Sequence, residues 1–472
     1  MKVVFTSLFQ SGMGGGAGRV AHELAEAFAR EHQVVMICPQ KTTGLQQTEG
    51  ELQVFGVRSA GDDEFHMPVL SVKSVRAIFD FLTEFQPQII HAHDPALIGL
   101  ICQVWARMNR VPFVHTAHVL PSRALDFGTT DAFNVKLLKS NFSESITHRV
   151  LGDFYANCDA IIALNRTAEE SIREFGYQGQ LYVIPNGRNL AKYRNVQIAD
   201  PGQEEKTIAF VGYLNERKNQ SYLLHVLRYL PEHYRLQLIG KALDPAYQKK
   251  LELIRDRYSL DRVDFLGQVP HEEIPDYLGK AHVFPSASQM EVQSLVIIEA
   301  LASGTPVVGL SNETVDELVD EQVGSRLPGD AEPEEFAAEI ERVASQDPAD
   351  YQEMCRQARE RVSGLDWSNI VHQTAQAYRE LLISKPLLSA EESDILSRLV
   401  SFFTTGDVEN FLTEKLTAYR YKWNREIHSD EELQFPTRFL SWIRVPTSTW
   451  LISGITVLVS VFGYLFMKGK RR

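Results

Sequence analysis

The stretch SASQMEVQSLVIIEALASGTPVVGL (286–310) is the part of the sequence that decides the fold. Its apolar run LVIIEALAS has the length of a helix, and it is followed by Gly304, a residue type that commonly ends helices. The runs on either side, HVFPSA (282–287) and TPVVGL (305–310), have the composition of buried strands. We therefore expect a strand, a loop, a helix and a second parallel strand, which is the repeating unit of a doubly wound sheet.

Two glutamates lie within this unit. Glu291 falls in the predicted loop, and Glu299 falls one turn inside the predicted helix. The helix N-terminus, near Ser294 and Leu295, presents unpaired backbone N–H groups and a partial positive charge, which suit a diphosphate. Glu299 could then accept hydrogen bonds from paired ribose hydroxyls, and Glu291 from a second sugar beyond the phosphates. On the spacing alone, two solvated or capping glutamates are the simpler interpretation.

The alternation of strand and helix patterns extends over most of the chain. VVFTSLF (3–9) leads through glycines to a helical pattern, and the alternation restarts after the polar stretch IADPGQEEK (198–206). We predict an α/β protein with two doubly wound, Rossmann-like parallel-sheet domains, residues 1–197 and 198–385, facing a cleft. The last helix of the second domain could cross back to the first. A ligand would lie in the cleft, at the carboxyl ends of the strands of both domains.

The C-terminal part has a different character. Residues 386–440 have the pattern of charged amphipathic helices, and we predict a helical extension there. Within 441–472, the run from Trp450 to Met467 carries no charged residue and is followed by KGKRR. As a helix it would span roughly 27 Å, just enough to cross a bilayer core. We predict a membrane anchor; a buried helix and a helix lying in the membrane plane are the alternatives.

The composition excludes several classes of protein. Of 472 residues, 44% are hydrophobic and 23% charged, which is typical of a globular protein. The net charge of -13 argues against a nucleic-acid partner, which needs a basic surface. The N-terminus lacks the long apolar core of a signal peptide, so we expect catalytic domains in the cytoplasm, held at a membrane by a single-pass or monotopic anchor. The basic tail favours the opposite orientation of a spanning anchor, because basic residues tend to stay on the cytoplasmic side of a membrane. Four widely spaced cysteines, which indicate a reducing compartment and no zinc site, are Cys38, Cys102, Cys158 and Cys355.

Other candidate features lie in the first domain. The glycine cluster 14–16 follows the first predicted strand and precedes a helix, so it is a candidate phosphate cradle or a plain tight turn. His91 and His93 alternate on a predicted strand and share a face, but without an apparent third ligand a structural role is favoured over a metal site. Residues 135–155 form either a basic amphipathic helix facing anionic lipid or an ordinary solvated helix.

The stretch 286–310 resembles the Glu-x7-Glu signature of the family 4 (group 1) retaining glycosyltransferases, which have the GT-B fold. Gln293 is similar to a variant of that motif in members that glucosylate diacylglycerol, which are membrane-associated. The resemblance covers about residues 1–385. The further motifs of the family occur in its order: GGAGRV (15–20), HAHDP (91–95), VHTAH (114–118), VIPNG (183–187), FVGYLNERKN (210–219) and FLGQVP (265–270).

The resemblance implies that a hexose is transferred from a nucleoside diphosphate sugar with retention and without a metal. It implies that Lys218 offsets the charge of the leaving diphosphate and that His118 contacts the transferred sugar. Arg217 could replace an arginine that the family often has where this chain has Tyr213. The implied catalytic residues are His118, Glu291 and Lys218. The implied donor-binding residues are Gly15, Gly16, Arg217, Lys218, Glu291, Ser294, Leu295 and Glu299.

The acceptor is predicted from the anchor. An enzyme held at a membrane meets a membrane acceptor, so we expect a diacylglycerol-type lipid or a lipid-linked glycan precursor. One alternative is a soluble or polysaccharide acceptor. Another is a weakly active nucleotide-sugar-binding scaffold subunit that recruits partners through 386–440. It is motivated by Tyr213 and by Val292, Gln293 and Ser294, where many family members read Gly-Phe-Gly after the first glutamate.

Overall fold

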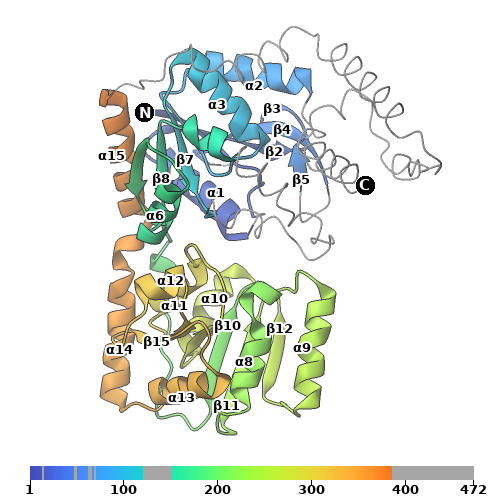
Figure 1. Ribbon diagram of the computed structural model, residues 1–472, viewed down its shortest axis with the longest axis vertical. Helices are drawn as coiled ribbons and strands as arrows, with labels where there is room; N and C mark the ends of the chain where they lie inside the picture. Colours follow the sequence, from blue (N-terminus) through green and yellow to red (C-terminus); the bar gives the residue numbers. More distant parts are fainter. Residues whose placement is uncertain (13–14, 47–49, 62–65, 69–70, 121–150, 385–472) are drawn as a thin grey trace, which may run out of the picture.

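The computed structural model describes residues 1–12, 15–46, 50–61, 66–68, 71–120 and 151–384. They form two α/β domains (Figure 1). The predicted extension (386–440), the predicted anchor (441–472) and residues 135–150 of the predicted basic helix lie outside the described residues. In the part of the chain that is described, no helix has both the length and the apolar character needed to cross a membrane.

The N-terminal domain is built on one sheet with strand order β3-β4-β2-β1-β6-β7-β8-β9, and β5 pairs with β4. The strand pairs are parallel except those of β3 and β5 with β4. The central strands are buried on both faces, as expected where helices cover a parallel sheet. The strands are β1 (Lys2–Thr6), β2 (Gln33–Gln40), β3 (Gly44–Leu45), β4 (Gln53–Gly61), β5 (His66–Pro68), β6 (Ile89–Ala92), β7 (Phe113–Ala117), β8 (Ala160–Ala163) and β9 (Gln180–Val183). The helices are α1 (Gly15–Ala29), α2 (Val72–Phe85), α3 (Leu97–Asn109) and α6 (Arg166–Glu174). The next helix, α7 (Ala191–Arg194), already packs on the C-terminal domain, and Tyr193 is buried in a core cluster of that domain.

The C-terminal domain contains two parallel three-stranded sheets, β10-β11-β12 and β13-β14-β15. A bridge between Ile208 and Val283 joins them, and the Ala209 N–H donates to the Val283 carbonyl at 3.2 Å. The strands thus follow the order β12-β11-β10-β13-β14-β15. They are β10 (Lys206–Val211), β11 (Tyr234–Ile239), β12 (Val263–Gly267), β13 (Phe284–Ser286), β14 (Val307–Leu310) and β15 (Gly324–Leu327). The helices are η3 (Glu216–Lys218), α8 (Gln220–Leu227), α9 (Pro245–Arg257), η4 (His271–Glu273), α10 (Ile274–Lys280), α11 (Leu295–Ser303), α12 (Glu313–Leu318), α13 (Pro333–Ala344), α14 (Pro348–Arg361) and η5 (Ser363–Leu365).

The strand–helix–strand unit predicted from 286–310 is confirmed. β13 leads through a loop to α11, and β14 pairs with β13 in parallel. Gly304 ends α11 with φ +82°, and its N–H donates to the Ala300 and Leu301 carbonyls. A glycine suits this left-handed position because it has no Cβ. The predicted α/β class with parallel sheets in both halves is confirmed as well.

The last described helix, α15 (Trp367–Ser384), returns to the N-terminal domain. Figure 1 shows α14 beside the C-terminal domain and α15 beside the N-terminal one. Trp367, Ile370 and Tyr378 are buried in the same core cluster as Phe5 and Phe28 of the N-terminal domain. The chain therefore passes between the domains twice, once after β9 and once before α15.

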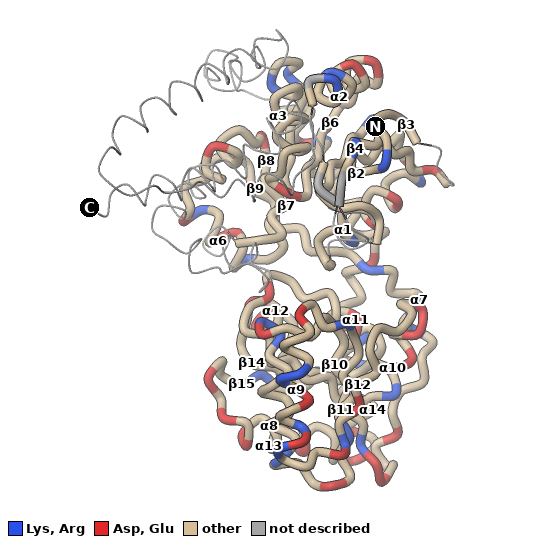
Figure 2. Tube along the Cα trace, turned by 90° about the vertical axis from the view of Figure 1, so that its right-hand side faces the viewer, with Lys and Arg blue, Asp and Glu red and all other residues tan. Residues whose placement is uncertain are grey.

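Charged residues of both signs are interspersed over the two domains (Figure 2). Several basic and acidic side chains form pairs one helical turn apart, such as Arg356 with Glu353 and Glu360 on α14. Exposed pairs of this kind contribute little to stability. The pairs that matter for the site are buried ones, within the C-terminal domain and between the domains.

Two glycines bring β10 and β11 close together at the edge of the sheet that carries the site. Gly240 follows β11 with φ +144°, and a Cβ there would lie 2.0 Å from the carbonyl oxygen of Gly212, which follows β10. No side chain fits such a gap without moving the backbone. Gly240 is thus required by both its conformation and its surroundings.

Gly240→Ala should destabilise the C-terminal domain by about 2 kcal/mol or more, because it adds backbone strain to a steric clash. The measurement is the midpoint of thermal or urea unfolding. Gly364→Ala is the matched control, since no heavy atom lies within 4 Å of its Cβ position and its φ is not positive. Equal effects of the two substitutions would contradict this account.

Candidate active site

Lys218 and Glu291 meet at the carboxyl edge of the C-terminal sheet. Lys218 closes η3, where the Asn215 side chain accepts its backbone N–H at 2.9 Å. Glu291 lies in the loop between β13 and α11, and Lys218 Nζ forms an ion pair with its Oε1. The Gln289 N–H donates to the Arg217 carbonyl at 3.0 Å, which holds the two loops together. The structure thus brings together two of the predicted residues, whose side chains are 12% and 9% exposed; the Arg217 side chain is half-buried beside them.

The glycine loop of the N-terminal domain faces this region. A Cβ at Gly16 would lie 3.1 Å from Leu295 Cδ1, at the start of α11. A Cβ at Gly15, which has φ +60°, would lie 3.7 Å from Tyr213 Cε2. The glycines therefore permit the first turn of α1 to approach the helix N-terminus that was predicted to bind a diphosphate.

Ser294 is the N-cap residue of α11, but its side chain does not cap the helix. Its backbone N–H donates to Thr314 Oγ1 at 2.7 Å. A phosphate could use this N–H only by replacing Thr314. The N–H groups of the first turn, which starts at Leu295, have no acceptor within a regular helix and are better placed to bind the phosphate.

Glu299 lies deeper and is 1% exposed. Its Oε1 lies 3.1 Å from Arg188 Nε and 3.7 Å from Arg19 Nη1. The Tyr193 hydroxyl also donates a hydrogen bond to Glu299, and burial followed by the Glu299 charge raises the pKa of Tyr193. Our sequence analysis did not identify these three neighbours. The one signal for Arg188 was a charged residue directly after the VIPNG motif.

The loop after Glu291 docks on the N-terminal domain. Gln293 Oε1 accepts the Asn186 N–H at 2.6 Å, and its Nε2 donates to the Leu164 carbonyl at 3.3 Å. Asn165 Nδ2 donates to the Val292 carbonyl at 2.7 Å, and the Val292 side chain is buried in an N-terminal core cluster. Val292 and Gln293, which stand where many family members have Gly-Phe, therefore hold the domains together.

The histidines lie on β6 and β7 or directly after them, on the other side of the cleft. His118 Nε2 lies 2.9 Å from His93 Nδ1, with the two rings stacked. His91 contacts Tyr378 Oη at 2.5 Å and Thr116 Oγ1 at 2.7 Å, so both of its nitrogens have partners in the N-terminal domain. Within the described ranges no three His, Cys, Asp or Glu side chains are grouped to hold a metal ion. Metal independence stays a prediction.

Burial keeps these histidines neutral at pH 7. It lowers the pKa of His118 to about 4 and that of His115 to about 3. The pKa values of His91 and His93 are also lowered well below 6.5, first by burial and then by the neighbouring histidines. A neutral His118 can donate one hydrogen bond and accept another, which suits contact with a sugar hydroxyl.

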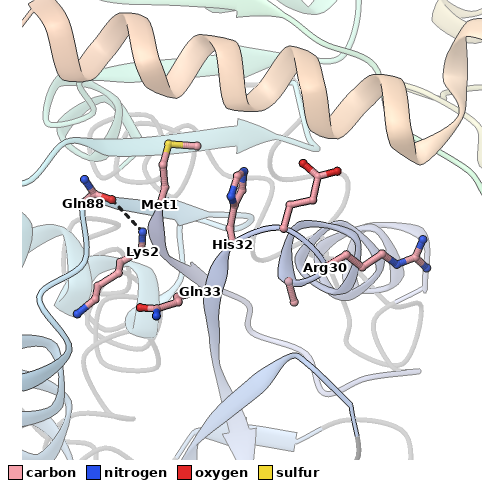
Figure 3. Close-up of a pocket in the computed structure, with 8 residues that line it drawn as sticks. Met1, Lys2, Arg30, His32, Gln33 and Gln88 are labelled. Carbon is pink, nitrogen blue, oxygen red and sulfur yellow. Dashed lines mark hydrogen bonds between the residues drawn. The ribbon is translucent and has the colours of Figure 1, made fainter.

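The hollow drawn in Figure 3 lies elsewhere. It has a volume of about 460 Å³ and is lined by Lys2, Gln33 and Gln88, which lie at or just before the amino ends of β1, β2 and β6. Lys2 N–H donates to Gln88 Oε1 at 3.0 Å across it. The residues described above lie at the carboxyl ends of the strands, so this hollow is separate from the candidate site.

The neutral histidines predict a stability that falls on acidification. The unfolded chain binds a proton at each histidine near pH 6.5, whereas the folded chain does so only at lower pH, so stability rises with pH between these values. From pH 7.5 to pH 5.5, each such histidine should cost about 1 kcal/mol of unfolding free energy. Asp94, whose pKa burial raises to about 6, opposes this by a smaller amount. Urea unfolding at both pH values is the measurement.

His115→Asn is the matching variant, because His115 is buried and, within the described part of the chain, its ring hydrogen-bonds to the Ala92 carbonyl alone. It should reduce the difference in unfolding free energy between the two pH values by about 1 kcal/mol, whatever its effect at pH 7.5. An unchanged difference would show that His115 titrates normally in the folded chain.

Comparison with known proteins identifies the family. The family model described as Glycosyltransferase Family 4 matches residues 14–192, and the model described as Glycosyl transferases group 1 matches residues 194–361. An alpha-monoglucosyldiacylglycerol synthase of Streptococcus pneumoniae is 26% identical over 257 residues, which are 52% of this chain and 56% of that protein. A glycogen synthase of Mycobacterium tuberculosis is 25% identical over 390 residues, which are 77% of this chain and 91% of that protein. The chain spans about half the length of several of its curated relatives.

A solved structure shares the fold of this chain. The sucrose-phosphate synthase structure from Thermosynechococcus elongatus superposes with a TM-score of 0.66 at 23% identity, covering 81% of this chain and 99% of that one. This likeness concerns the fold, and it agrees with the two facing α/β domains described above. The chain belongs to the family 4 (group 1) glycosyltransferases and has their two-domain GT-B architecture.

Proposed function

We propose that this protein transfers a hexose from a nucleoside diphosphate sugar, with retention of configuration, to a lipid or lipid-linked acceptor at a membrane. One observation carries the donor side of the proposal. The ion pair of Lys218 and Glu291 lies in the loops beside the N-terminus of α11, with Glu299 one turn deeper and the glycine loop opposite. That arrangement offers the Glu291 carboxylate to the sugar, the Lys218 cation and the backbone N–H groups of α11 to the diphosphate, and the Glu299 carboxylate to the ribose.

Each of these residues has a separate role in donor activation. Lys218 and the first turn of α11 offset the negative charge that develops on the leaving diphosphate, which needs no metal ion. Glu291 holds the Lys218 ammonium in place and can accept hydrogen bonds from the sugar. His118, on the opposite domain, contacts a hydroxyl of the same sugar. By resemblance to the family, the leaving phosphate takes the acceptor proton, so no protein nucleophile is proposed.

Two arguments favour a lipid acceptor. The Streptococcus pneumoniae relative is named for the synthesis of a glucosyldiacylglycerol. The sequence also predicts an anchor at 450–467, outside the described residues, which would hold the cleft near a bilayer. A soluble or polysaccharide acceptor is the second candidate, because the glycogen synthase match covers nearly the whole of that relative.

The test uses the full chain in anionic vesicles that contain diacylglycerol, with a panel of nucleoside diphosphate sugars. Release of nucleoside diphosphate together with a glycolipid product is the expected result. Product formed only on glycogen or sugar phosphates added in solution would favour the second candidate. Tight donor binding without release, with any acceptor, would overturn the transferase proposal in favour of a binding scaffold.

Lys218→Gln should lower kcat at least about 100-fold, because the charge of the leaving group loses its nearest cation. Lys250→Gln is the matched control: Lys250 is exposed on α9 and pairs with the equally exposed Glu216. Its turnover should stay within about twofold of the parent chain. Steady-state kinetics on both variants decide, and similar rates would mean that Lys218 does not contact the leaving diphosphate.

A further inference from the structure

Arg188 is a buried cation at the place where the chain passes between the domains. Its side chain is 2% exposed. Its backbone N–H donates to the Leu365 carbonyl at 2.8 Å, and the Trp367 N–H donates to its carbonyl at 3.2 Å. These bonds join the two interdomain passages to each other. A Cβ at Gly187 would lie 2.3 Å from Trp367 Cε3, so the backbone is pressed against the indole ring. The position of the Arg188 side chain is therefore fixed by both passages.

The guanidinium of Arg188 joins one carboxylate from each domain. Nη1 donates to Glu23 Oε2, on α1, at 2.7 Å, and Trp367 Nε1 donates to the same oxygen at 3.2 Å. Nε lies 3.1 Å from Glu299 Oε1, on α11. A buried charge is costly unless it is paired, so both carboxylates are needed to keep an arginine here.

The two sides of the Arg188–Glu299 pair keep unused hydrogen-bonding capacity. Glu299 Oε1 is buried and accepts no hydrogen bond of good geometry from the described residues, since the contact with Arg188 Nε is an ion pair without hydrogen-bond alignment. Arg188 Nη2 is buried and has no described acceptor. Buried polar atoms are nearly always bonded, so an unpaired acceptor and an unpaired donor on adjacent groups indicate a ligand that supplies both functions.

A hydroxyl group supplies both functions. It can donate to a carboxylate oxygen and accept from a guanidinium N–H at the same time. Glu299 is also the carboxylate that the proposed function assigns to the ribose of the donor. We propose that Arg188 is a second ribose-binding residue, whose Nη2 donates to a ribose hydroxyl while Glu299 Oε1 accepts from the sugar. This inference rests on the proposed function.

Arg19 is the group that has to give way. It lies on the first turns of α1, its side chain is 38% exposed, and its contact with Glu299 is the longer of the two, at 3.7 Å. Its Nη1 also contacts His271 Nε2 at 3.3 Å. Burial lowers the pKa of His271 to about 4, so this contact adds no charge at pH 7. Arg188 is held by Glu23 and stays in place when Arg19 moves.

The experiment compares ribose with deoxyribose. Calorimetry first finds which of UDP, ADP and GDP binds the full chain, and that nucleotide is then compared with its 2′-deoxy and 3′-deoxy forms. Loss of the bound hydroxyl should weaken binding to the parent chain about tenfold or more, since it bonds to charged groups. In Arg188→Met, the same loss should cost at most about threefold, while binding of that deoxynucleotide stays within about twofold of the parent. Arg356→Met, on an exposed arginine of α14, should leave the tenfold preference unchanged.

Other results overturn the inference. An unchanged preference for ribose in Arg188→Met, or equal weakening of both nucleotides, would make Arg188 a purely structural residue. Tighter ribonucleotide binding would make it a competitor of the ribose for Glu299. If Arg188→Met does not fold, Glu23→Gln tests the same point, because it removes the charge on the other side of the guanidinium and should reduce the preference at least threefold. If none of the three nucleotides binds the parent chain, the proposed function fails rather than this inference.

Discussion

The arrangement of the two domains depends on one buried cation. Arg188 can be buried only because it forms ion pairs with Glu23 and Glu299. These carboxylates come from different domains. The backbone around Arg188 is bonded to the second passage between the domains through Leu365 and Trp367. The ribose end of the predicted donor site and the joint between the domains are therefore the same piece of structure, and a change in one is felt in the other.

The local part of this structure could be predicted from the sequence. The β13–α11–β14 unit follows from apolar runs of the right length and from Gly304, and these are properties of neighbouring residues. The alternation of strand and helix patterns predicted two facing domains, and the match to the family models shows the family. The roles of Lys218, Glu291 and His118 are predictions that the geometry is compatible with and that experiments have to decide.

The contacts between distant segments could not be predicted in this way. Arg188 pairs with Glu23 across 165 positions, and Gln293 bonds to Asn186 across 107. Neither pairing leaves a periodic pattern, because each residue is placed by its own element and the elements meet only in the folded chain. From the sequence, Val292 is a lost glycine near the sugar, and Gln293 is a likeness to members that glucosylate diacylglycerol. In the structure these residues bind the loop of Glu291 to the N-terminal domain.

The contacts of Gln293 and those of Arg188 have different consequences for how a donor reaches the cleft. A Cβ at Gly16 would already lie 3.1 Å from Leu295, so a diphosphate between them has to displace the Leu295 side chain or separate the domains. The bonds of Gln293 cross directly from one domain to the other and are lost on separation. Arg188 lies at the joint itself, where separation moves the groups least, so it can keep Glu299 oriented while the cleft opens. On the proposed function, the ribose end of the donor site would need only Arg19 to move, whereas the sugar end would be assembled when the domains close.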